Sequence, residues 1–268
     1  MADVLQPIER LIHDPSPEVL CAAAGDCRLT EDLALALLER RDLPASGLEQ
    51  LAKHPALKKS RKVLLALVTH PHTPRFVSLP LLRHLHTFEL MQVALTPAVA
   101  ADVKAAADEA IFNRRQTISL GERLTLAKRG SGRLAGALLL DSEPRVVEAV
   151  VDNPKLTEAL VVKALMKDRA PQALAEAICR HPKWSLRREV QRALLCNPGT
   201  PLGRVLAIAH SLPIEALREV MRQSRLSENV RQYLNRELEA RVAGKGEPQS
   251  QTRISQARRR AVVKADRG

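Results

Sequence analysis

The fold class is decided by two stretches of the chain, LAKHPALKKSRKVLLALVTHPHTPRFVSLPLL at residues 51–82 and ICRHPKWSLRREVQRALLCNPGTPLGRVLAIA at residues 178–209. In both, x-Pro pairs flank an amphipathic segment, and a Thr-Pro pair follows. Proline disfavours helix in the residue before it and cannot continue a helix. The two stretches therefore predict short helices separated by proline turns.

A threonine recurs along the chain at a nearly constant spacing. Thr30, Thr73, Thr117, Thr157 and Thr200 follow one another at intervals of 43, 44, 40 and 43 residues. A period of about 40–47 residues is typical of helical repeats. Because Thr73 and Thr200 precede Pro74 and Pro201, these threonines are predicted N-caps, with proline at the first helical position.

Other residues mark further helix boundaries. Ser16 before Pro17, and the capping box from Ser119 to Glu122, predict two more helix starts. The prolines expected to end helices are Pro15, Pro55, Pro97, Pro144 and Pro182 in one set, and Pro71, Pro154 and Pro198 in another. Each unit thus contains three short helices, for example from Thr30 to about Arg41, from about Ser46 to Lys53 and from about Leu57 to Thr69.

The helices share a buried stripe. Eight, four and three residues before the second set of prolines lie apolar side chains: Val63, Val146 and Val190; Leu67, Val150 and Leu194; and Val68, Val151 and Leu195. This spacing is one face of an amphipathic helix. Eight residues after the threonines come Leu38, Leu81, Leu165 and Ile208, whereas the third unit has Thr125 there.

Composition agrees with a helical protein. Of the 268 residues, 45% are hydrophobic but only 2% are aromatic. Strands favour aromatic and β-branched residues, so this balance fits helices packed by aliphatic side chains. The four cysteines, Cys21, Cys27, Cys179 and Cys196, lack the spacing of a disulfide framework. With no signal peptide and no long apolar run, a cytoplasmic location is expected.

The quoted stretches resemble the leucine-rich repeat variant group of bacterial α-solenoids, in which Asn-Pro-x-Thr-Pro phrases recur; residues 197–201 here are such a phrase. The three-helix period is more similar to armadillo and HEAT repeats. Over about residues 5–240, the resemblance implies an all-α, right-handed α-solenoid of about five three-helix repeats. Some proteins of the group bind an iron–sulfur cluster through closely spaced cysteines. Because only Cys21 and Cys27 are close here, no cofactor is expected.

The chain is predicted to divide into a repeat domain at residues 1–241 and a basic tail at residues 242–268. The tail is rich in Gly, Gln, Ser and Arg and is expected to be disordered when free. Its candidate phosphate-binding residues are Arg258, Arg259, Arg260 and Lys264. A purely solubilising tail is the alternative.

Basic residues also recur where the third helices begin, and the formal net charge of the chain is +12. The candidate binding residues are Lys58, Lys59, Arg61 and Lys62; Arg145; and Lys183, Trp184, Arg187, Arg188 and Arg192. Third helices line the concave surface of armadillo-like solenoids, so the resemblance implies a basic groove. The alternatives are a solvated helix face for the cations and a packing role for Trp184.

The positions of the histidines and the absence of known catalytic motifs argue against catalysis. His54, His70 and His181 precede prolines, as Asn153 and Asn197 do, so this slot predicts capping of terminal carbonyls and no metal site. The sequence has no Walker loop, no G-x-G-x-x-G, no H-E-x-x-H and no Cys-x-x-Cys. A glycosylase-like helical-repeat enzyme would share the fold and charge, but base handling calls for aromatic groups that are scarce here.

The sequence therefore predicts a non-enzymatic scaffold or adaptor that holds a protein or peptide partner, acidic in character, along its concave surface. The alternative is a nucleic-acid-binding solenoid that uses the basic groove and the tail for DNA or RNA phosphates. Neither a small-molecule substrate nor a membrane span is expected.

Overall fold

The computed structural model describes residues 7–222 and 226–242, and these residues form an all-α protein without strands. They divide into two compact units, Met1–Leu160 and Val161–Gly268. The first unit contains α1 Ile8–Leu11, α2 Pro17–Ala24, α3 Glu31–Leu38, α4 Ala45–Lys53, α5 Arg61–Thr69, α6 Arg75–Leu81, the 3-10 helix η1 Leu82–His84, α7 Thr87–Leu95, α8 Ala101–Asn113, α9 Leu120–Arg129, α10 Gly132–Leu138 and α11 Pro144–Val151.

The unit boundary falls within α12, and the remaining helices belong to the second unit. They are α12 Glu158–Leu165, α13 Gln172–Arg180, α14 Arg188–Cys196, α15 Leu202–Ser211, α16 Ile214–Met221 and α17 Glu228–Val242. The predicted tail, with Arg258, Arg259, Arg260 and Lys264, lies outside the described residues. None of the helices in the described ranges has both the length and the apolar character needed to cross a bilayer.

Several helix starts form as predicted. The Thr30 hydroxyl caps α3 by accepting a hydrogen bond from the Leu33 N–H at 3.4 Å. Ser16 is the N-cap of α2, with Pro17 at the first helical position. Ser119 and Glu122 form the expected capping box at the start of α9. The caps at Thr30 and Ser119 are local in origin, because each satisfies a backbone N–H group that has no partner inside the helix, whereas the Ser16 side chain makes no such bond.

The prediction that Thr73 and Thr200 cap the helices that follow them is wrong. Pro74 and Pro201 are themselves the N-caps of α6 and α15. The hydroxyls of Thr73 and Thr200 instead donate, at 2.6 Å, to the carbonyls of Leu67 and Leu194 in the helix before. Each threonine thus satisfies a carbonyl near the end of a helix, where the last four carbonyls lack helical partners.

Three other predicted helix boundaries differ from the structure. Pro144, expected to end a helix, begins α11, because proline is tolerated at the first position, where its missing N–H leaves no bond unmade. Thr117 lies in a turn, and its hydroxyl donates to the Arg114 carbonyl at 2.8 Å. Helix α5 begins at Arg61, four residues after Leu57, because Ser60 caps it.

The predicted buried stripe is confirmed. All nine of its valines and leucines are buried: Val63, Leu67, Val68, Val146, Val150, Val151, Val190, Leu194 and Leu195. Leu38, Leu165 and Ile208 are buried as well, whereas Leu81 and Thr125 are half-buried. Burying a Val or Leu side chain contributes about 1.5–3 kcal/mol, so this stripe supplies much of the packing energy.

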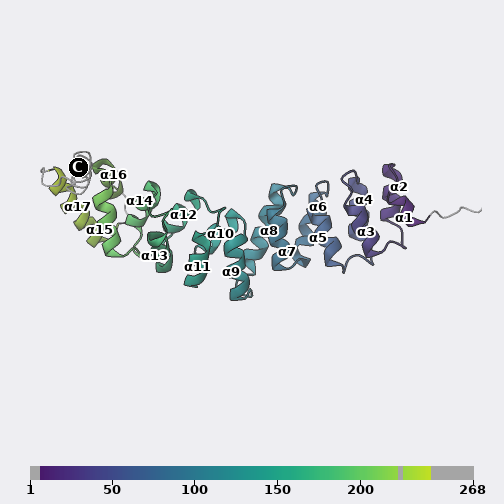
Figure 1. Ribbon diagram of the computed structural model, residues 1–268, viewed down its shortest axis with the longest axis horizontal. Helices are drawn as coiled ribbons and strands as arrows, with labels where there is room; N and C mark the ends of the chain where they lie inside the picture. The colour runs from purple at the N-terminus through teal and green to yellow at the C-terminus, as the bar shows by residue number, and fades with distance from the viewer. Residues whose placement is uncertain (1–6, 223–225, 243–268) are drawn as a thin grey trace, which may run out of the picture. The chain divides into compact units, whose positions relative to one another are not determined.

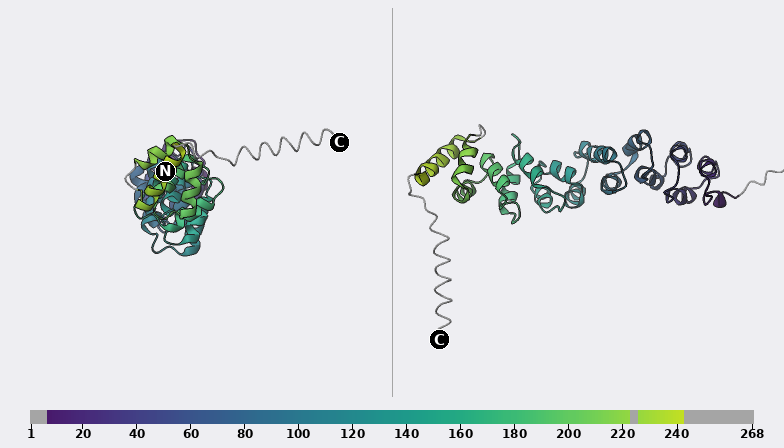
Figure 2. Two further views of the ribbon diagram at one scale, coloured as in Figure 1. Left: turned by 90° about the vertical axis from the view of Figure 1, so that its left-hand side faces the viewer. Right: turned by 90° about the horizontal axis from the view of Figure 1, so that it is seen from above.

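Within each unit, helices pack on the helix two positions further along the chain. In the first unit, α2 packs on α4, α3 on α5, α5 on α7, α6 on α8, α8 on α10 and α9 on α11. Figure 1 shows α2, α4, α6 and α8 in one row and α3, α5 and α7 in the other, and Figure 2 shows these helices following one another in chain order. The second unit pairs α14 with α16 and α15 with α17. The packing thus repeats every two helices, whereas the threonines recur once every three helices.

Side chains from the x-Pro slots tie each row together. His54 Nε2 lies 3.1 Å from the Asp26 carbonyl, and His70 Nε2 lies 2.9 Å from the Arg40 carbonyl. In the same slot, the amides of Asn153 and Asn197 donate at 2.7 Å to the carbonyls of Ala127 and Leu165. The capping prediction is confirmed for these four residues. The carbonyl that each one satisfies, however, lies at the end of the helix two earlier or in the turn just after it, so the bond joins neighbouring helices.

Candidate binding surfaces

The predicted basic residues concentrate in two turns of closely similar backbone geometry. We call residues 54–61 the Pro55 turn and residues 181–188 the Pro182 turn. In the Pro55 turn, the Lys58 N–H donates to the His54 carbonyl at 3.2 Å, and in the Pro182 turn the Ser185 N–H donates to the His181 carbonyl at 3.1 Å. In both turns the fourth residue, Leu57 or Trp184, is 2% exposed. The two turns thus present corresponding positions to solvent.

The Pro55 turn offers two exposed lysines. Lys58 and Lys59 are exposed in the turn before α5. Arg61 is engaged, because its guanidinium lies 2.7 Å from a Glu89 carboxylate oxygen. Burial by itself raises the pKa of Glu89, but hydrogen bonds from Arg61 and the His86 N–H lower that pKa overall, so the carboxylate remains charged. Lys62 lies 4.0 Å from Glu31 at an exposed site, where an ion pair is weak.

The Pro182 turn holds Lys183 over a buried tryptophan. The Lys183 ammonium lies 4.1 Å from the centroid of the Trp184 ring. Because only 2% of Trp184 is exposed, the structure favours the packing role that the sequence left open as the alternative for this residue. The fourth position of the turn must fill the space beneath the helix ends, which a large apolar ring does well. Of these two residues, only Lys183 is therefore exposed for contact with a partner.

Sequence reasoning missed an exposed leucine in the same turn. Leu186 is 76% exposed, and it precedes the exposed residues Arg187 and Arg188. Its only signal in the sequence is a large apolar residue at a turn position where the Pro55 turn has Lys59. Single exposed leucines are common. Here the leucine stands among cations on a braced turn, which makes it a candidate contact residue.

Side-chain hydrogen bonds brace the Pro182 turn. His181 Nδ1 accepts from the N–H groups of Lys183 at 3.1 Å and Trp184 at 3.4 Å. The Gln191 amide donates to the Ser185 carbonyl at 2.9 Å. These bonds hold the backbone on both sides of Leu186. A preorganised surface loses less conformational entropy on binding than a mobile loop does.

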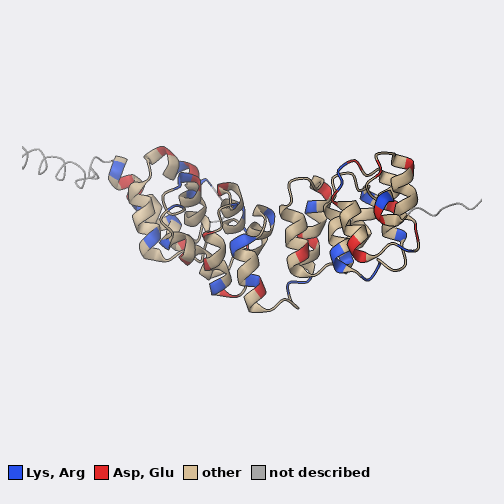
Figure 3. Ribbon diagram, turned by 45° about the vertical axis from the view of Figure 1, so that its right-hand side comes forward, with Lys and Arg blue, Asp and Glu red and all other residues tan. Residues whose placement is uncertain are grey.

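The remaining candidates, Arg192 and Arg145, lie outside the two turns. Arg192 is engaged in α14, with guanidinium nitrogens 3.1 Å from Glu189 and 3.2 Å from Glu219. Arg145 is exposed on α11, but α7 and α9 separate that helix from α5 within its row. Figure 3 shows Lys and Arg mixed with Asp and Glu in each unit. Because the two turns belong to different units, a continuous basic groove stays a prediction.

An open hollow lies between α7 and α9 in the first unit. Its volume is about 660 Å³, and its lining includes Phe88, Met91, Leu95 and Pro97 from the α7 side and Thr125 and Arg129 from α9. Phe88 is 45% exposed. None of the residues that line the hollow is acidic. It is therefore an apolar surface with a cation at one side.

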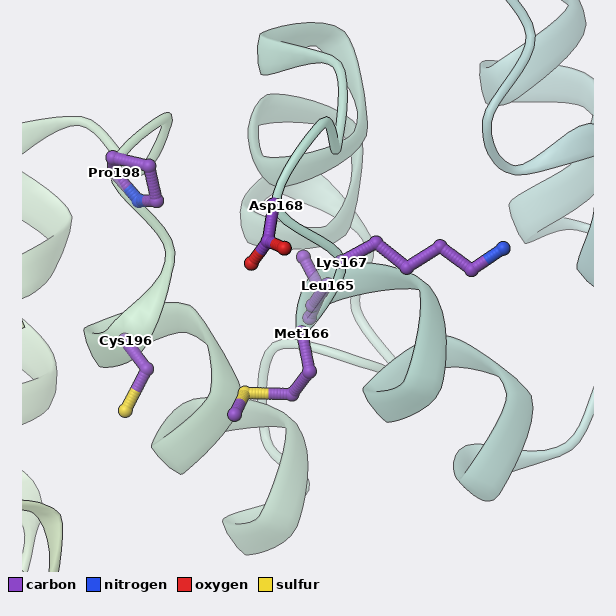
Figure 4. A pocket seen from close by; sticks show the side chains of 6 residues that line it. All are labelled: Leu165, Met166, Lys167, Asp168, Cys196 and Pro198. Carbon is purple, nitrogen blue, oxygen red and sulfur yellow. The ribbon is translucent and has the colours of Figure 1, made fainter. Parts of the chain in front are cut away.

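A second, smaller hollow lies between the C-terminal ends of α12 and α14. Its volume is about 260 Å³, and Met166, Asp168, Cys196 and Pro198 contribute to its lining. Figure 4 shows that Lys167, which also borders it, extends its amino group away from Cys196 and Pro198. This space is below the roughly 300–1,000 Å³ typical of small-molecule sites.

The titratable groups inside the described helices serve packing. Burial raises the pKa of Asp108, whose carboxylate accepts the Ser131 hydroxyl at 2.8 Å and thereby links α8 with α10. Burial also raises the pKa of the Cys179 thiol, which disfavours the nucleophilic thiolate. All four cysteines are free thiols in the structure. Over residues 7–222 and 226–242, no three His, Cys, Asp or Glu side chains are grouped to hold a metal ion.

No protein-family model, no curated protein and no solved structure matches this chain.

Proposed function

We propose that the chain is a non-enzymatic binding scaffold, a right-handed α-solenoid that holds an acidic protein or peptide partner along its concave surface. The recurrent stacking of helices on the helix two further along supports a repeat architecture, because such stacking extends without a closed core. Extended stacks offer preformed surfaces for long partners. The handedness and the concave surface are those implied by the resemblance to bacterial α-solenoids.

The proposal rests on the side chains that the Pro182 turn exposes to solvent. Leu186 is 76% exposed on a braced turn that also carries the exposed cations Lys183 and Arg188. An acidic peptide with an apolar side chain would use both features, since carboxylates pair with the cations and burial of the leucine adds hydrophobic energy. A phosphate backbone would use the cations and gain little from the leucine.

The Pro55 turn supports the alternative partner, nucleic acid. Its exposed residues Lys58 and Lys59 carry charge without an exposed apolar neighbour of the size of leucine. Phosphates of DNA or RNA bind such lysines without any need for apolar contact. The two turns thus favour different partners, and one experiment separates them.

The experiment compares three labelled probes on the full chain across a salt series: a peptide of glutamates interspersed with leucines, an all-glutamate peptide of the same charge, and a DNA duplex. We expect the leucine-containing peptide to bind about tenfold more tightly than the all-glutamate peptide. We expect Leu186→Ser to remove that advantage, because it removes the apolar contact and leaves every cation in place. Lys59→Ser serves as the matched variant in the other turn.

Tight duplex binding with a steep salt slope, unchanged by Leu186→Ser, would overturn the proposal in favour of nucleic acid. A version ending at Val242 shows whether such binding needs the tail. Duplex binding that persists in this version would place the phosphate contacts on the helical units.

A further inference from the structure

The row formed by α3, α5, α7, α9 and α11 opens at one point. Close packing joins α3 to α5, α5 to α7 and α9 to α11, but it does not join α7 to α9 among the described helices. The first turns of α7 and α9 approach each other at one link, where the Thr87 side chain contributes to lowering the pKa of the Glu122 carboxyl. The hollow of about 660 Å³ lies beyond that link, reaching Leu95 and Arg129 at the helix ends.

The opening coincides with the one irregularity of the sequence repeat. Eight residues after the recurring threonine, α3, α12 and α15 have Leu38, Leu165 and Ile208, all buried. Helix α9 has Thr125 there, half-buried and lining the hollow. Its hydroxyl donates to the Gly121 carbonyl at 3.0 Å, so it turns back onto its own helix. A smaller, polar side chain therefore lines the hollow, while the neighbouring Leu126 is the buried apolar residue of α9 at this level.

The charge of the hollow points to one kind of occupant. Arg129 is exposed at the end of α9, and within the described residues it makes no hydrogen bond or ion pair. Lys128 beside it is also exposed, and no acidic residue lines the hollow. Phe88, Met91 and Leu95 supply an apolar floor next to this unneutralised charge.

We propose that the hollow between α7 and α9 is a docking site for a short peptide segment of another protein, with a large apolar side chain and a neighbouring carboxylate. The apolar side chain seats against Phe88, Met91 and Leu95, where aromatic and Met side chains give adaptable apolar contact. The carboxylate pairs with the Arg129 guanidinium, which suits bidentate recognition. This surface is separate from the Pro182 turn and is tested separately.

The test begins with a phage library of random peptides of about twelve residues, panned on the full chain. We expect enriched peptides that combine a Leu, Phe, Trp or Met with an Asp or Glu. For the synthesised peptides, we expect Phe88→Ala and Arg129→Glu each to weaken affinity by about tenfold or more, as hot-spot residues do. Both residues are exposed, so circular dichroism should show an unchanged fold.

Two further variants sharpen the result. Thr125→Leu places a larger, apolar side chain in the lining and should weaken binding by narrowing the hollow. Arg169→Glu, a charge reversal at an exposed turn of the second unit, should leave affinity unchanged. The proposal is overturned if no peptide is enriched, or if the enriched peptides lack acids. It is equally overturned if their binding is lost with Leu186→Ser but kept with Arg129→Glu, which would assign them to the Pro182 turn.

Discussion

The Pro55 turn and the Pro182 turn share a frame and differ in what they present to solvent. Both begin with His-Pro, bury their fourth residue and precede an amphipathic helix. At the third position, Ala56 corresponds to Lys183, and at the sixth, Lys59 corresponds to Leu186. The comparison teaches that the frame needs only the x-Pro pair and the buried residue. The positions that face solvent are free to carry a binding function.

The two frames also use their histidines differently. His54 Nε2 reaches the Asp26 carbonyl, which ties the Pro55 turn to the preceding helix of its row. His181 Nδ1 accepts from two N–H groups of its own turn, which braces the backbone around Lys183 and Trp184. The two histidines thus differ at Nδ1, which accepts two N–H groups in His181 and has no hydrogen-bond partner in His54 within the described residues.

The largest expected effect on stability comes from truncating the buried fourth residue of either turn. Trp184→Ala should lower the free energy of unfolding by about 4 kcal/mol and Leu57→Ala by about 3 kcal/mol, because each leaves a cavity under its turn. Urea titration followed by circular dichroism measures both, and Lys59→Ala, at an exposed site, is the control. A loss below about 1 kcal/mol for either variant would show that the fourth position does not hold the turn.

The second largest expected effect on stability concerns the other end of α5, where His70 precedes Pro71 as His54 precedes Pro55. His70→Ala should cost about 1–3 kcal/mol, because it leaves the Arg40 carbonyl without its donor. Burial, chiefly, lowers the pKa of His70 below its usual 6.5. The neutral ring is therefore favoured in the folded state, and below about pH 6.5 the unfolded chain takes up the proton first.

The stability contributed by His70 is thus fully present above pH 6.5 and is lost as the pH falls through the lowered pKa of the folded state. The difference between the wild type and His70→Ala should shrink over that range in urea titrations. The exposed His13→Ala variant provides the control. A difference that stays constant with pH would contradict the assignment of a neutral, buried ring.

A smaller effect comes from exchanging the two surfaces. Leu186→Lys combined with Lys183→Ala should weaken binding of the leucine-containing acidic peptide by about tenfold. Ala56→Lys combined with Lys59→Leu should create binding at the Pro55 turn, with each unit's stability changed by less than about 0.5 kcal/mol. Peptide titration by fluorescence anisotropy measures both. If the created turn does not bind, the bracing by His181 matters as much as the exposed residues.

The smallest effect isolates the contact between Lys183 and Trp184. Lys183→Met should lower the free energy of unfolding by about 0.5–1 kcal/mol, since a cation over an aromatic face contributes this much at exposed sites. A double-mutant cycle with Trp184→Leu tests whether the loss depends on the ring. Equal losses with Trp and with Leu would assign the effect to the alkyl chain of the lysine.

Local features of the fold could be predicted because their causes are local. The stripe through Val190 and Leu194 follows from helical periodicity, and the Ser119 capping box needs only four consecutive residues. The threonine of Thr-Pro was misassigned because the sequence cannot show that the Leu194 carbonyl lies within reach of the Thr200 hydroxyl. Pro144 was misassigned because proline is compatible with either end of a helix boundary.

The candidate sites were predicted less completely than the fold. Lys58, Lys59, Lys183 and Arg188 are exposed as expected, because charged residues before a helix rarely have space to be buried. Hydrophobicity alone does not show which of Trp184 and Leu186 is buried. In the structure the aromatic ring is buried and the leucine is exposed. That choice depends on which residue of the turn faces the helices beneath it.

By itself, the sequence determined the all-α class, the proline turns and the buried faces, because periodicity, caps and proline act over a few residues. Only the tertiary structure decided that helices pack two apart, and that His54, His70, Asn153 and Asn197 bond carbonyls 28, 30, 26 and 32 residues earlier. It also decided that a hollow lies between α7 and α9, with Thr125 in its lining. These features depend on neighbours distant in the chain, and a single sequence records no such proximity.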